Sequence, residues 1–300
     1  MNLGEITPLV LTANEAANIV RSLAPLSWAQ RVIVLDSCSA DETCQIAGDF
    51  PNVRVQQRRF DSHSEQWNYG IDLVETEWVL ALDADYVLSA NFRNELAGLE
   101  AASDQNAFFA PFTYCVFGHR LRACVYPPRS VLFRKERSRF VQDGHTQRLV
   151  FEGRAGVLKS RILHDDRKPL GRWIAAQDRY ASLEAKHLCL VPSSQLSQQD
   201  RLRLRVDFAP LVMAFYLFII RGLVTGGWPA WYYVFQRVIA EMLLSLHLFE
   251  ERMGRSPSKA DVSSSERSED TGLSVTDGSE RHAHAWARAG ARADVGAVFH

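Results

Sequence analysis

Two carboxylates with the spacing of a metal site, Asp83 and Asp85, follow the apolar run at residues 79–82. Charged groups in so apolar a setting are costly unless something pairs with them. At the end of a strand, acids two positions apart can project into one cleft as the chain turns out of the sheet. Mg²⁺ and Mn²⁺ prefer such oxygen ligands and leave positions open for phosphate oxygens. Taken alone, the pair is more typical of a turn in which aspartate caps backbone amides.

Polar side chains also follow two other apolar runs. Asp36 ends one of them, where its carboxylate could accept hydrogen bonds from a nucleotide base or a ribose, or could cap a turn. Thr12 ends another, and Asn14 and Glu15 follow at the expected start of a helix, where backbone amides and the helix dipole favour anions. Glu15 is equally typical of a favourable first-turn charge. This segment has no glycine, which excludes a P-loop and a dinucleotide-binding fingerprint.

The segments that must position these side chains alternate between strand and helix patterns. Strands are predicted at residues 6–12, 31–36, 52–57 and 77–83, and helices at residues 14–26, 42–50 and 63–74. Such alternation is typical of βαβ units in an α/β fold with a parallel sheet. Right-handed crossovers then place the carboxyl ends of all the strands at one edge, where open α/β sheets bind ligands. We therefore expect the polar residues to meet at that edge.

The second half of the chain changes character. Residues 107–165 predict a less regular half, made of strands and loops, that closes over the sheet edge, and residues 170–188 predict an amphipathic helix. We divide the chain into a catalytic domain at 1–190, a helical segment at 191–254 and a disordered tail at 255–300, because the tail has too few large apolar residues to offset the cost of ordering.

The helical segment contains an unbroken apolar run at residues 208–220. The run is shorter than the roughly 18 residues that a bilayer span needs. Arginines flank it, and aromatic residues cluster just after it, at Trp228, Trp231, Tyr232 and Tyr233. This pattern favours an element lying in the plane of a membrane surface. A buried helix pair and a re-entrant or spanning hairpin are the alternatives.

The composition limits the class of protein. The chain has 300 residues, 47% of them hydrophobic, and a formal net charge of -1, which argues against bulk nucleic-acid binding. Its five cysteines are odd in number and form no CxxC pair, which is typical of reduced thiols in the cytosol. The first residues lack the pattern of a secretory signal. We expect a cytoplasmic protein at the inner face of the cell membrane.

Taken together, four motifs resemble those of the family 2 glycosyltransferases. They are PLVLTANEAANIVRSL, VIVLDSCSADETCQIA, EQWNYGID and EWVLALDADYVLS, which occur in this order and at ordinary spacing. Within the family, they are most similar to bacterial enzymes of lipopolysaccharide-core and exopolysaccharide assembly. The resemblance covers about residues 5–190 well and the following helical segment more loosely.

The resemblance implies a GT-A fold, a Rossmann-like mixed sheet flanked by helices, with a nucleotide-sugar donor and Mg²⁺ or Mn²⁺ as the cofactor. It implies donor-binding roles by position: Thr12, Asn14 and Glu15 would line the nucleotide pocket, Asp36 would contact the base, and Gln66 and Asn68 would lie near the base or ribose. Asp83 would hold the ribose or a metal-bound water, and Asp85 the metal and the diphosphate. His164 would contact the metal or diphosphate, and Arg129 the diphosphate or acceptor; a structural role is the alternative for both.

Such enzymes invert the anomeric centre by single displacement and need a general base for the acceptor hydroxyl. Relatives often carry a His-Glu pair in the segment that reads FVQDGHTQRLVFEG here, and Gln147 falls at the glutamate position. An amide cannot act as a base. We predict that Asp143, or else His145, replaces it. A hairpin turn at Asp143 is the alternative to a catalytic role.

The resulting hypothesis is a metal-dependent, inverting glycosyltransferase that acts on a lipid-linked, lipopolysaccharide or exopolysaccharide acceptor. Two other classes stay open. The missing glutamate is compatible with a catalytically inactive homologue that serves as an assembly partner. A sugar-nucleotidyltransferase is less favoured, because that reaction usually needs a glycine-rich loop and a basic residue after the first strand, which TANEAAN does not provide.

Overall fold

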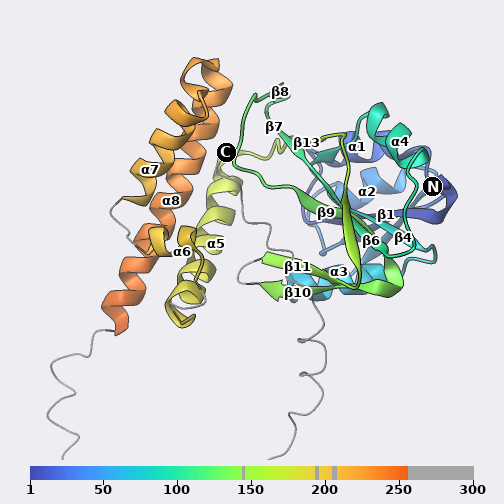
Figure 1. Cartoon of the computed structure of the whole chain (residues 1–300), viewed down its shortest axis with the longest axis horizontal. Coiled ribbons are helices and arrows are strands. Elements are labelled where there is room, and N and C mark those ends of the chain that lie inside the picture. The colour runs from blue at the N-terminus through green and yellow to red at the C-terminus, as the bar shows by residue number, and fades with distance from the viewer. Residues whose placement is uncertain (144–145, 193–195, 205–207, 256–300) are drawn as a thin grey trace, which may run out of the picture.

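A computed structural model describes residues 1–143, 146–192, 196–204 and 208–255 of the chain. The last of the predicted regions, the tail at 255–300, lies outside the described residues apart from its first position. The described part consists of a sheet-based portion and a group of C-terminal helices that stands beside it (Figure 1).

A seven-stranded mixed sheet forms the centre of the molecule. In sheet order its strands are β12 (Arg154–Val157), β6 (Gln105–Ala110), β9 (Arg129–Arg134), β4 (Trp78–Asp83), β1 (Ile6–Thr12), β2 (Val32–Asp36) and β3 (Val53–Gln57). The four N-terminal strands are parallel to one another, and β9 runs antiparallel to both β4 and β6. The predicted mixed α/β fold, with helices flanking the sheet, is confirmed.

Alternate residues of the central strands enter two different cores. Val10, Val34 and Leu80 pack on one face of the sheet, and Leu9 and Ile33 pack on the other. Both faces are covered, so these strands appear in the sequence as continuous apolar runs rather than as alternating patterns. This is why the sequence predicted the four N-terminal strands to within one residue at each end.

Four helices accompany the N-terminal strands: α1 (Ile19–Leu23), α2 (Thr43–Gly48), α3 (His63–Asp72) and α4 (Ala90–Ala97). Helices α1, α2 and α4 cover one face of the sheet, and α3 covers the other together with the hairpin of β10 (Ser138–Asp143) and β11 (Thr146–Phe151). Helix α3 lies close to the sheet, because a Cβ added at Gly70 would come within 2.8 Å of the Leu9 side chain.

A second, small sheet connects distant segments of the chain. Its strands are β5 (Tyr86–Val87), β13 (Ile162–His164), β7 (Phe112–Val116) and β8 (His119–Arg120). The register pairs His164 with Tyr86 on one side and with Tyr114 on the other. The small sheet thereby carries a histidine from the second half of the chain to the segment that follows Asp83.

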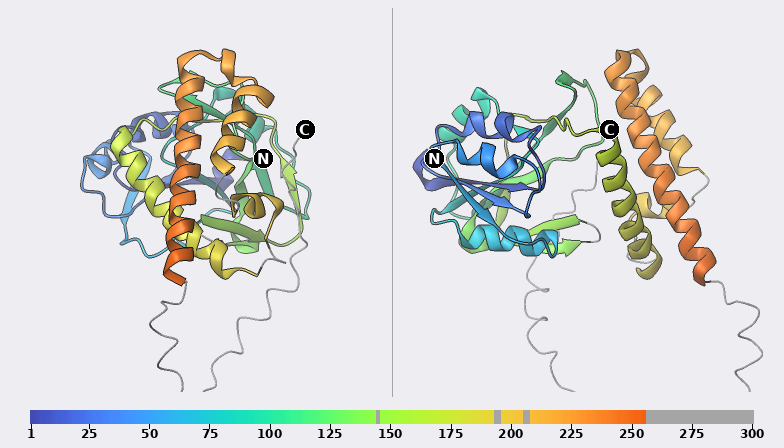
Figure 2. Two further views of the ribbon diagram at one scale, coloured as in Figure 1. Left: turned by 90° about the vertical axis from the view of Figure 1, so that its left-hand side faces the viewer. Right: turned by 180° about the vertical axis from the view of Figure 1, so that it is seen from behind.

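The C-terminal helices are α5 (Leu170–Leu190), α6 (Gln198–Arg203), α7 (Ala209–Phe215), which continues into a π-helical turn at Tyr216–Ile220, and α8 (Gly227–Arg255). Figure 2 shows that α5 lies next to the sheet-based portion, and that α7 and α8 lie farther from the sheet than α5 does. Helix α5, assigned from the sequence to the catalytic domain, shares a core with α8 through Ala185, Leu188 and Leu248. Within the described residues, no helix is both long and apolar enough to cross a membrane.

The packing of β4 yields a stability prediction. Leu80 is 0% exposed at the centre of the sheet, so Leu80→Ala leaves a cavity and is expected to lower the free energy of unfolding by about 3 kcal/mol. Urea denaturation measures the change. Leu190→Ala, at a side chain that is 72% exposed, is the matched control and is expected to change stability by less than about 0.5 kcal/mol. Equal losses for the two variants would contradict this account of the core.

Candidate active site

The carboxyl ends of three neighbouring strands bring the predicted polar residues together. Thr12 at the end of β1 is in register with Asp36 at the end of β2, and Leu11 is in register with Asp83 at the end of β4. The shared sheet edge that the strand pattern predicted is therefore present, and it sets the positions of the site residues described below.

Asp36 is a centre of hydrogen bonding at this edge. It is 0% exposed, and its carboxylate accepts bonds from the Thr12 hydroxyl (2.8 Å), from the Ser39 amide (2.7 Å) and hydroxyl (2.5 Å), and from the Gln57 side chain (3.3 Å). Burial opposes ionisation, but these donors outweigh it and lower the pKa of Asp36. In the structure Asp36 organises the turn after β2, and the predicted contact to a base would require it to give up one of these bonds.

The turn after β1 is fastened to the turn after β2. Asn14 has a left-handed backbone, with φ of 57°, and its side chain accepts a bond from the Ala40 amide at 2.7 Å. The amides of Asn14 and Glu15 donate to the hydroxyls of Ser39 and Thr43, both at 2.6 Å. Because of these contacts, residues 14–18 are not helical. The helix predicted at 14–26 therefore begins only at Ile19.

Glu15 points into a buried polar cluster. Its carboxylate accepts a bond from Asn18 at 2.9 Å and forms an ion pair with Lys168 at 2.6 Å. Burial raises the pKa of Glu15 to about 7, with the charge of Asp85 adding to it and Lys168 opposing it. Burial would lower the pKa of Lys168, but Glu15, Asp85 and Asp166 together raise it. The ammonium group therefore stays charged beside Asp85.

The carboxylate pair is partly buried and asymmetric, and the side chain of Asp85 is 13% exposed. Burial would raise the pKa of Asp85, but His164 and Lys168 lower it to about 2, so this residue is ionised. Burial and the charge of Asp85 raise the pKa of Asp83. The Oδ2 atom of Asp85 lies 3.2 Å from Nε2 of His164, whereas its Oδ1 atom is buried without a hydrogen-bond partner in the described part of the chain.

Three tyrosines surround His164. The ring centroids of Tyr126, Tyr114 and Tyr86 lie 4.6, 4.8 and 5.5 Å from that of the imidazole, and the hydroxyls of Tyr86 and Tyr126 are hydrogen-bonded at 2.6 Å. The guanidinium of Arg129 lies 5.4 Å from the centroid of Tyr126. The rings fix the imidazole against Asp85. This cage was not predicted, because it depends on the register of the small sheet and no local pattern indicates it.

The loop after β13 is anchored to α1 through Asp165. Its carboxylate pairs with Arg21 at 2.5 Å, accepts from Arg167 at 3.0 Å and accepts from the amide of Gly118 at 2.9 Å. These contacts hold in place the segment that contains His164, at the end of β13, and Lys168, in the loop after it. The structure places His164 beside Asp85 and Arg129 beside Tyr126, and their roles in binding a metal, a diphosphate or an acceptor stay predictions.

The other predicted residues are placed differently. The Gln66 amide binds Arg58 (2.7 Å) and Ser37 (3.2 Å) beside the turn after β2. Each polar atom of the Asn68 amide bonds to the backbone of Phe140 at 2.9 Å, so Asn68 joins α3 to β10, and its predicted place near the base or ribose stays a prediction. Asp143 ends β10 and its side chain is not described, and His145 lies outside the described residues.

The carboxylate pair could supply only some of the ligands of a divalent cation. Within the residues that the structure describes, no group of three or more His, Cys, Asp and Glu side chains is arranged to hold a metal. Asp83 and Asp85 offer two carboxylates, one with an oxygen that has no partner. Mg²⁺ and Mn²⁺ sites of this kind take their remaining ligands from phosphate oxygens and water. The residues present are compatible with such an ion.

Comparison with known proteins connects this site to one family. Residues 9–137 match the family described as glycosyl transferase family 2. The chain is 24% identical over 199 residues to an uncharacterized glycosyltransferase of Rickettsia felis, a match that covers 61% of this chain and 70% of the relative. It is 27% identical over 145 residues to one of Rickettsia bellii, a match that covers 47% of this chain and 49%, or about half, of that relative.

Two solved structures are similar over longer stretches. One is residues 1–349 of S. aureus TarS in complex with UDP-GlcNAc, with 14% identity, a TM-score of 0.44 and coverage of 84% of this chain and 93% of that chain. The other is glucosyl-3-phosphoglycerate synthase from Mycobacterium tuberculosis with Mn²⁺, UDP and phosphoglyceric acid, with 18% identity, a TM-score of 0.43 and coverage of 63% and 80%. The topology and site geometry above do not depend on these two proteins.

The bonds to Asp36 yield a prediction about stability and pH. Asp36→Asn keeps only one of the two accepting oxygens and loses the charge, so it cannot accept all the bonds that Asp36 receives, and its free energy of unfolding at pH 7 should be about 2 kcal/mol lower. The folded-state pKa of Asp36 lies below its ordinary value of 3.8, so the ionised group stabilises the fold above that value. The gap between wild type and variant should therefore hold from neutral pH to about pH 5 and narrow as the pH falls further.

Urea denaturation across this pH range measures the gap. Asp49→Asn, at an exposed carboxylate on the helix that follows the same turn, is the control and should leave the curve unchanged. A gap that stays constant down to pH 3 would show that the charge of Asp36 does not stabilise the turn.

Proposed function

We propose that the protein transfers a sugar from a nucleoside-diphosphate sugar to a glycan or glycolipid acceptor, on the premise that residues 9–137 match glycosyl transferase family 2. The observation that carries the proposal is the partly buried pair of Asp83 and Asp85, in which Oδ1 of Asp85 is buried without a hydrogen-bond partner in the described part of the chain. An unpaired buried oxygen of this kind is costly, and a ligand that supplies positive charge removes the cost.

The donor is proposed to bind along the sheet edge, with its diphosphate beside Asp85. A bound Mg²⁺ or Mn²⁺ would neutralise charge on the leaving diphosphate. Lys168 supports this placement, because its ammonium group carries charge next to Asp85 while it is paired with Glu15 at 2.6 Å. His164 holds the second oxygen of Asp85 and so orients the carboxylate.

Transfer is proposed to occur with inversion, by direct attack of an acceptor hydroxyl on the sugar. The hydroxyl must lose its proton, and Asp143 or His145 at the end of the β10–β11 hairpin stays the predicted base. The hairpin packs on α3 through Phe140 and Leu149, on the side of the sheet opposite to α1.

The acceptor is proposed to be lipid-linked, as in lipopolysaccharide or exopolysaccharide assembly, and the enzyme to act at the inner face of the cell membrane. The support is an exposed apolar surface, which we call the outer face. Its residues are Leu211, Val212, Phe215, Ile219 and Ile220 on α7 and its π-helical extension, and Trp228, Trp231, Phe235, Ile239, Met242, Leu246, Phe249 and Met253 on α8. Steps of three and four residues along α8 place its members on one side of the helix.

The outer face has the properties of an in-plane membrane element. It spans two helices, and extended exposed apolar patches mark interaction surfaces. Basic side chains flank one end, where Arg122 donates to Thr225 at 2.7 Å and the ring of His119 lies 5.2 Å from that of Trp228. Arg120 is exposed in the same hairpin. Arginines beside an apolar face suit anionic lipid headgroups.

The carboxylate pair yields a binding prediction. Asp85→Asn removes the ionised oxygen ligand, so binding of UDP in the presence of Mn²⁺ should weaken at least about ten-fold in isothermal titration. Chelation of the metal should weaken binding by the wild type to the same level. Asp104→Asn, at an exposed carboxylate paired with Arg154, is the control and should bind as the wild type does. Normal binding and turnover by Asp85→Asn would overturn the site assignment.

The same protein distinguishes the alternative functions. Incubation with a panel of UDP-, GDP- and dTDP-sugars and Mn²⁺ should release free sugar slowly, because water can replace the acceptor. Donor binding without any release in wild type would indicate an inactive homologue. Release of pyrophosphate from a nucleoside triphosphate and a sugar phosphate would indicate a nucleotidyltransferase.

The outer face yields a membrane prediction. Wild-type protein should float with vesicles of phosphatidylcholine and phosphatidylglycerol in equal amounts. Phe215→Asp combined with Phe235→Asp should lower the bound fraction roughly ten-fold, because each change replaces an exposed aromatic ring that would enter the membrane surface by a charged group. Arg120→Gln combined with Arg122→Gln should lower binding to these vesicles only, and not to neutral ones.

Leu190→Asp, which introduces the same charge at an exposed leucine outside the outer face, is the matched control. Absence of flotation, together with a concentration-dependent dimer that Phe215→Asp and Phe235→Asp dissociate, would show instead that the outer face binds a second copy of the chain.

A further inference from the structure

A buried asparagine, Asn18, bonds to both the turn after β1 and the loop after β13. It is 1% exposed, and its amide nitrogen donates to Glu15 at 2.9 Å and to Asp166 at 3.1 Å. Its amide oxygen accepts from the backbone amide of Arg167 at 3.1 Å and from the guanidinium of Arg21 at 2.5 Å. One side chain therefore connects two segments that are about 150 residues apart in sequence.

The amide of Asn18 is held in one orientation. A carboxamide has two N–H donors and an oxygen that accepts two bonds, and both sets are used here. The two carboxylates lie on the nitrogen side and the two donors on the oxygen side, so a rotation by half a turn would place like groups against each other. Buried polar groups that are fully satisfied in this way are rigid. Asn18 therefore orients the carboxylates of Glu15 and Asp166.

Those two carboxylates hold Lys168 at both of its ends. The Oδ1 atom of Asp166, which accepts from Asn18, also accepts from the backbone amide of Lys168 at 3.0 Å. Glu15 accepts from Asn18 through Oε2, and its other oxygen, Oε1, lies 2.6 Å from the Lys168 ammonium. The backbone and the charged group of Lys168 are thus both placed by partners of Asn18.

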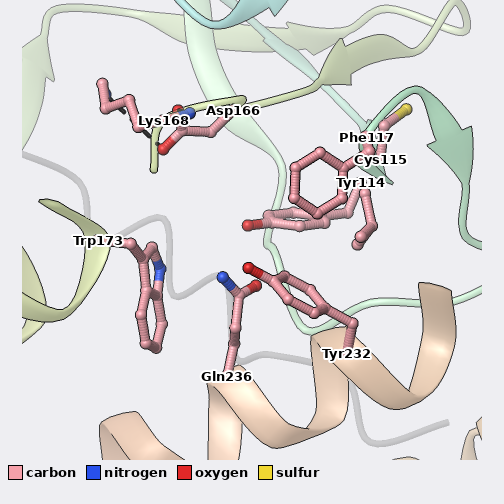
Figure 3. Close-up of a pocket in the computed structure, with 9 residues that line it drawn as sticks. Tyr114, Cys115, Phe117, Asp166, Lys168, Trp173, Tyr232 and Gln236 are labelled. Atoms are coloured by element: carbon pink, nitrogen blue, oxygen red, sulfur yellow. Dashed lines mark hydrogen bonds and ion pairs between the residues drawn. The ribbon is translucent and has the colours of Figure 1, made fainter. Parts of the chain in front are cut away.

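The ammonium group of Lys168 has capacity for a further partner. It carries three N–H donors, and the contact with Glu15 uses one of them. The Oδ2 atom of Asp166 lies at 3.7 Å, which is beyond hydrogen-bond distance. Figure 3 shows Lys168 and Asp166 at the rim of a hollow of about 20 Å³, which has room for a water molecule or two. Donors of the ammonium group are therefore left for the oxygen atoms of water or of a ligand.

The segment that contains Lys168 starts directly beside Asp85. The imidazole of His164 lies 3.2 Å from the Asp85 carboxylate, and the amide of Asp165 donates to the Asp85 carbonyl at 3.0 Å. Lys168 follows three residues later, and its positive charge helps to lower the pKa of Asp85. A diphosphate bound at Asp85 through a divalent cation presents negative oxygens, with which an ammonium group forms charge-assisted hydrogen bonds.

The loop after β13 does not need the pair of Lys168 and Glu15 as an anchor. Asp165 already fastens the loop, because it pairs with Arg21 and accepts from the Gly118 amide. A buried ion pair is weak evidence for stability, since the loss of hydration offsets the attraction. The position of Lys168 next to Asp85 is therefore better explained by ligand binding than by stability.

We infer that Asn18 is a positioning residue, which holds Lys168 where its ammonium group donates to a diphosphate oxygen of the nucleotide. The inference rests on the proposed nucleotide-sugar donor, and it adds a cation supplied by the protein to the diphosphate site. Asn18 itself does not contact the nucleotide in this arrangement. It acts through Glu15 and Asp166, which hold the two ends of Lys168.

Binding measurements on the full chain with Mn²⁺ test this inference. The probes are UDP, GDP and dTDP, measured by isothermal titration, and the matching nucleosides, measured by saturation-transfer NMR. Lys168→Gln keeps a donor for Glu15 but has no charge, so it should weaken diphosphate binding roughly ten-fold and leave nucleoside binding unchanged. Asn18→Leu, of similar size, should weaken diphosphate binding about five-fold. The double variant should bind no more weakly than Lys168→Gln alone, because both changes act on one interaction.

Asn106→Leu is the matched control. Asn106 on β6 is 7% exposed, and its amide donates to the Glu152 carbonyl at 2.7 Å, so this variant also loses a buried hydrogen bond. Its melting temperature should fall, whereas its diphosphate binding should stay within about two-fold of wild type. Asn18→Ser takes the place of Asn18→Leu if the latter does not fold.

Three results would overturn the inference. They are wild-type diphosphate binding by folded Lys168→Gln, multiplication of the two single effects in the double variant, and an equal loss of nucleoside and diphosphate binding in the Asn18 variant, which would show a structural role only. Failure of wild type to bind any of the three nucleoside diphosphates would overturn the proposed function, and the inference with it.

Discussion

Partial burial of two neighbouring carboxylates, Asp83 at the end of β4 and Asp85 just after it, is the constraint on which the rest of the site depends. A buried charge is tolerated only when other groups satisfy it, and removing one partner of a buried pair is strongly destabilising. Asp85 is satisfied on one side by His164 and by the nearby charge of Lys168. Both partners come from a segment about 80 residues farther along the chain than Asp85. The fold must bring that segment to the end of β4 before the carboxylates can be accommodated.

The small sheet and the salt bridges of Asp165 hold this segment next to the end of β4. Strand β13 pairs with β5 directly after Asp85, and Asp165 fastens the next residues to Arg21 on α1 and to the turn after β7. Strand β13 thus supplies His164 to Asp85, and the loop after it supplies Lys168 to Glu15.

Sequence patterns predicted the parts of this arrangement that are local. Strands buried on both faces appear as apolar runs, and the acids that follow them share an edge by the rule of right-handed crossovers. Non-local contacts were beyond such reasoning. The first helix begins at Ile19 rather than at Asn14, because side chains from the turn after β2 capture the intervening amides. The tyrosine cage of His164 depends on strand register between segments that no periodicity relates. The general base stays a prediction, because the side chain of Asp143 and the whole of His145 lie outside the described part of the chain.

The region that matches the family ends at residue 137, yet the site does not end there. His164 and Lys168 lie beyond that limit. A change in the carboxy-terminal part of the chain would therefore leave Asp85 without its partners unless it kept a histidine and a lysine at these two places.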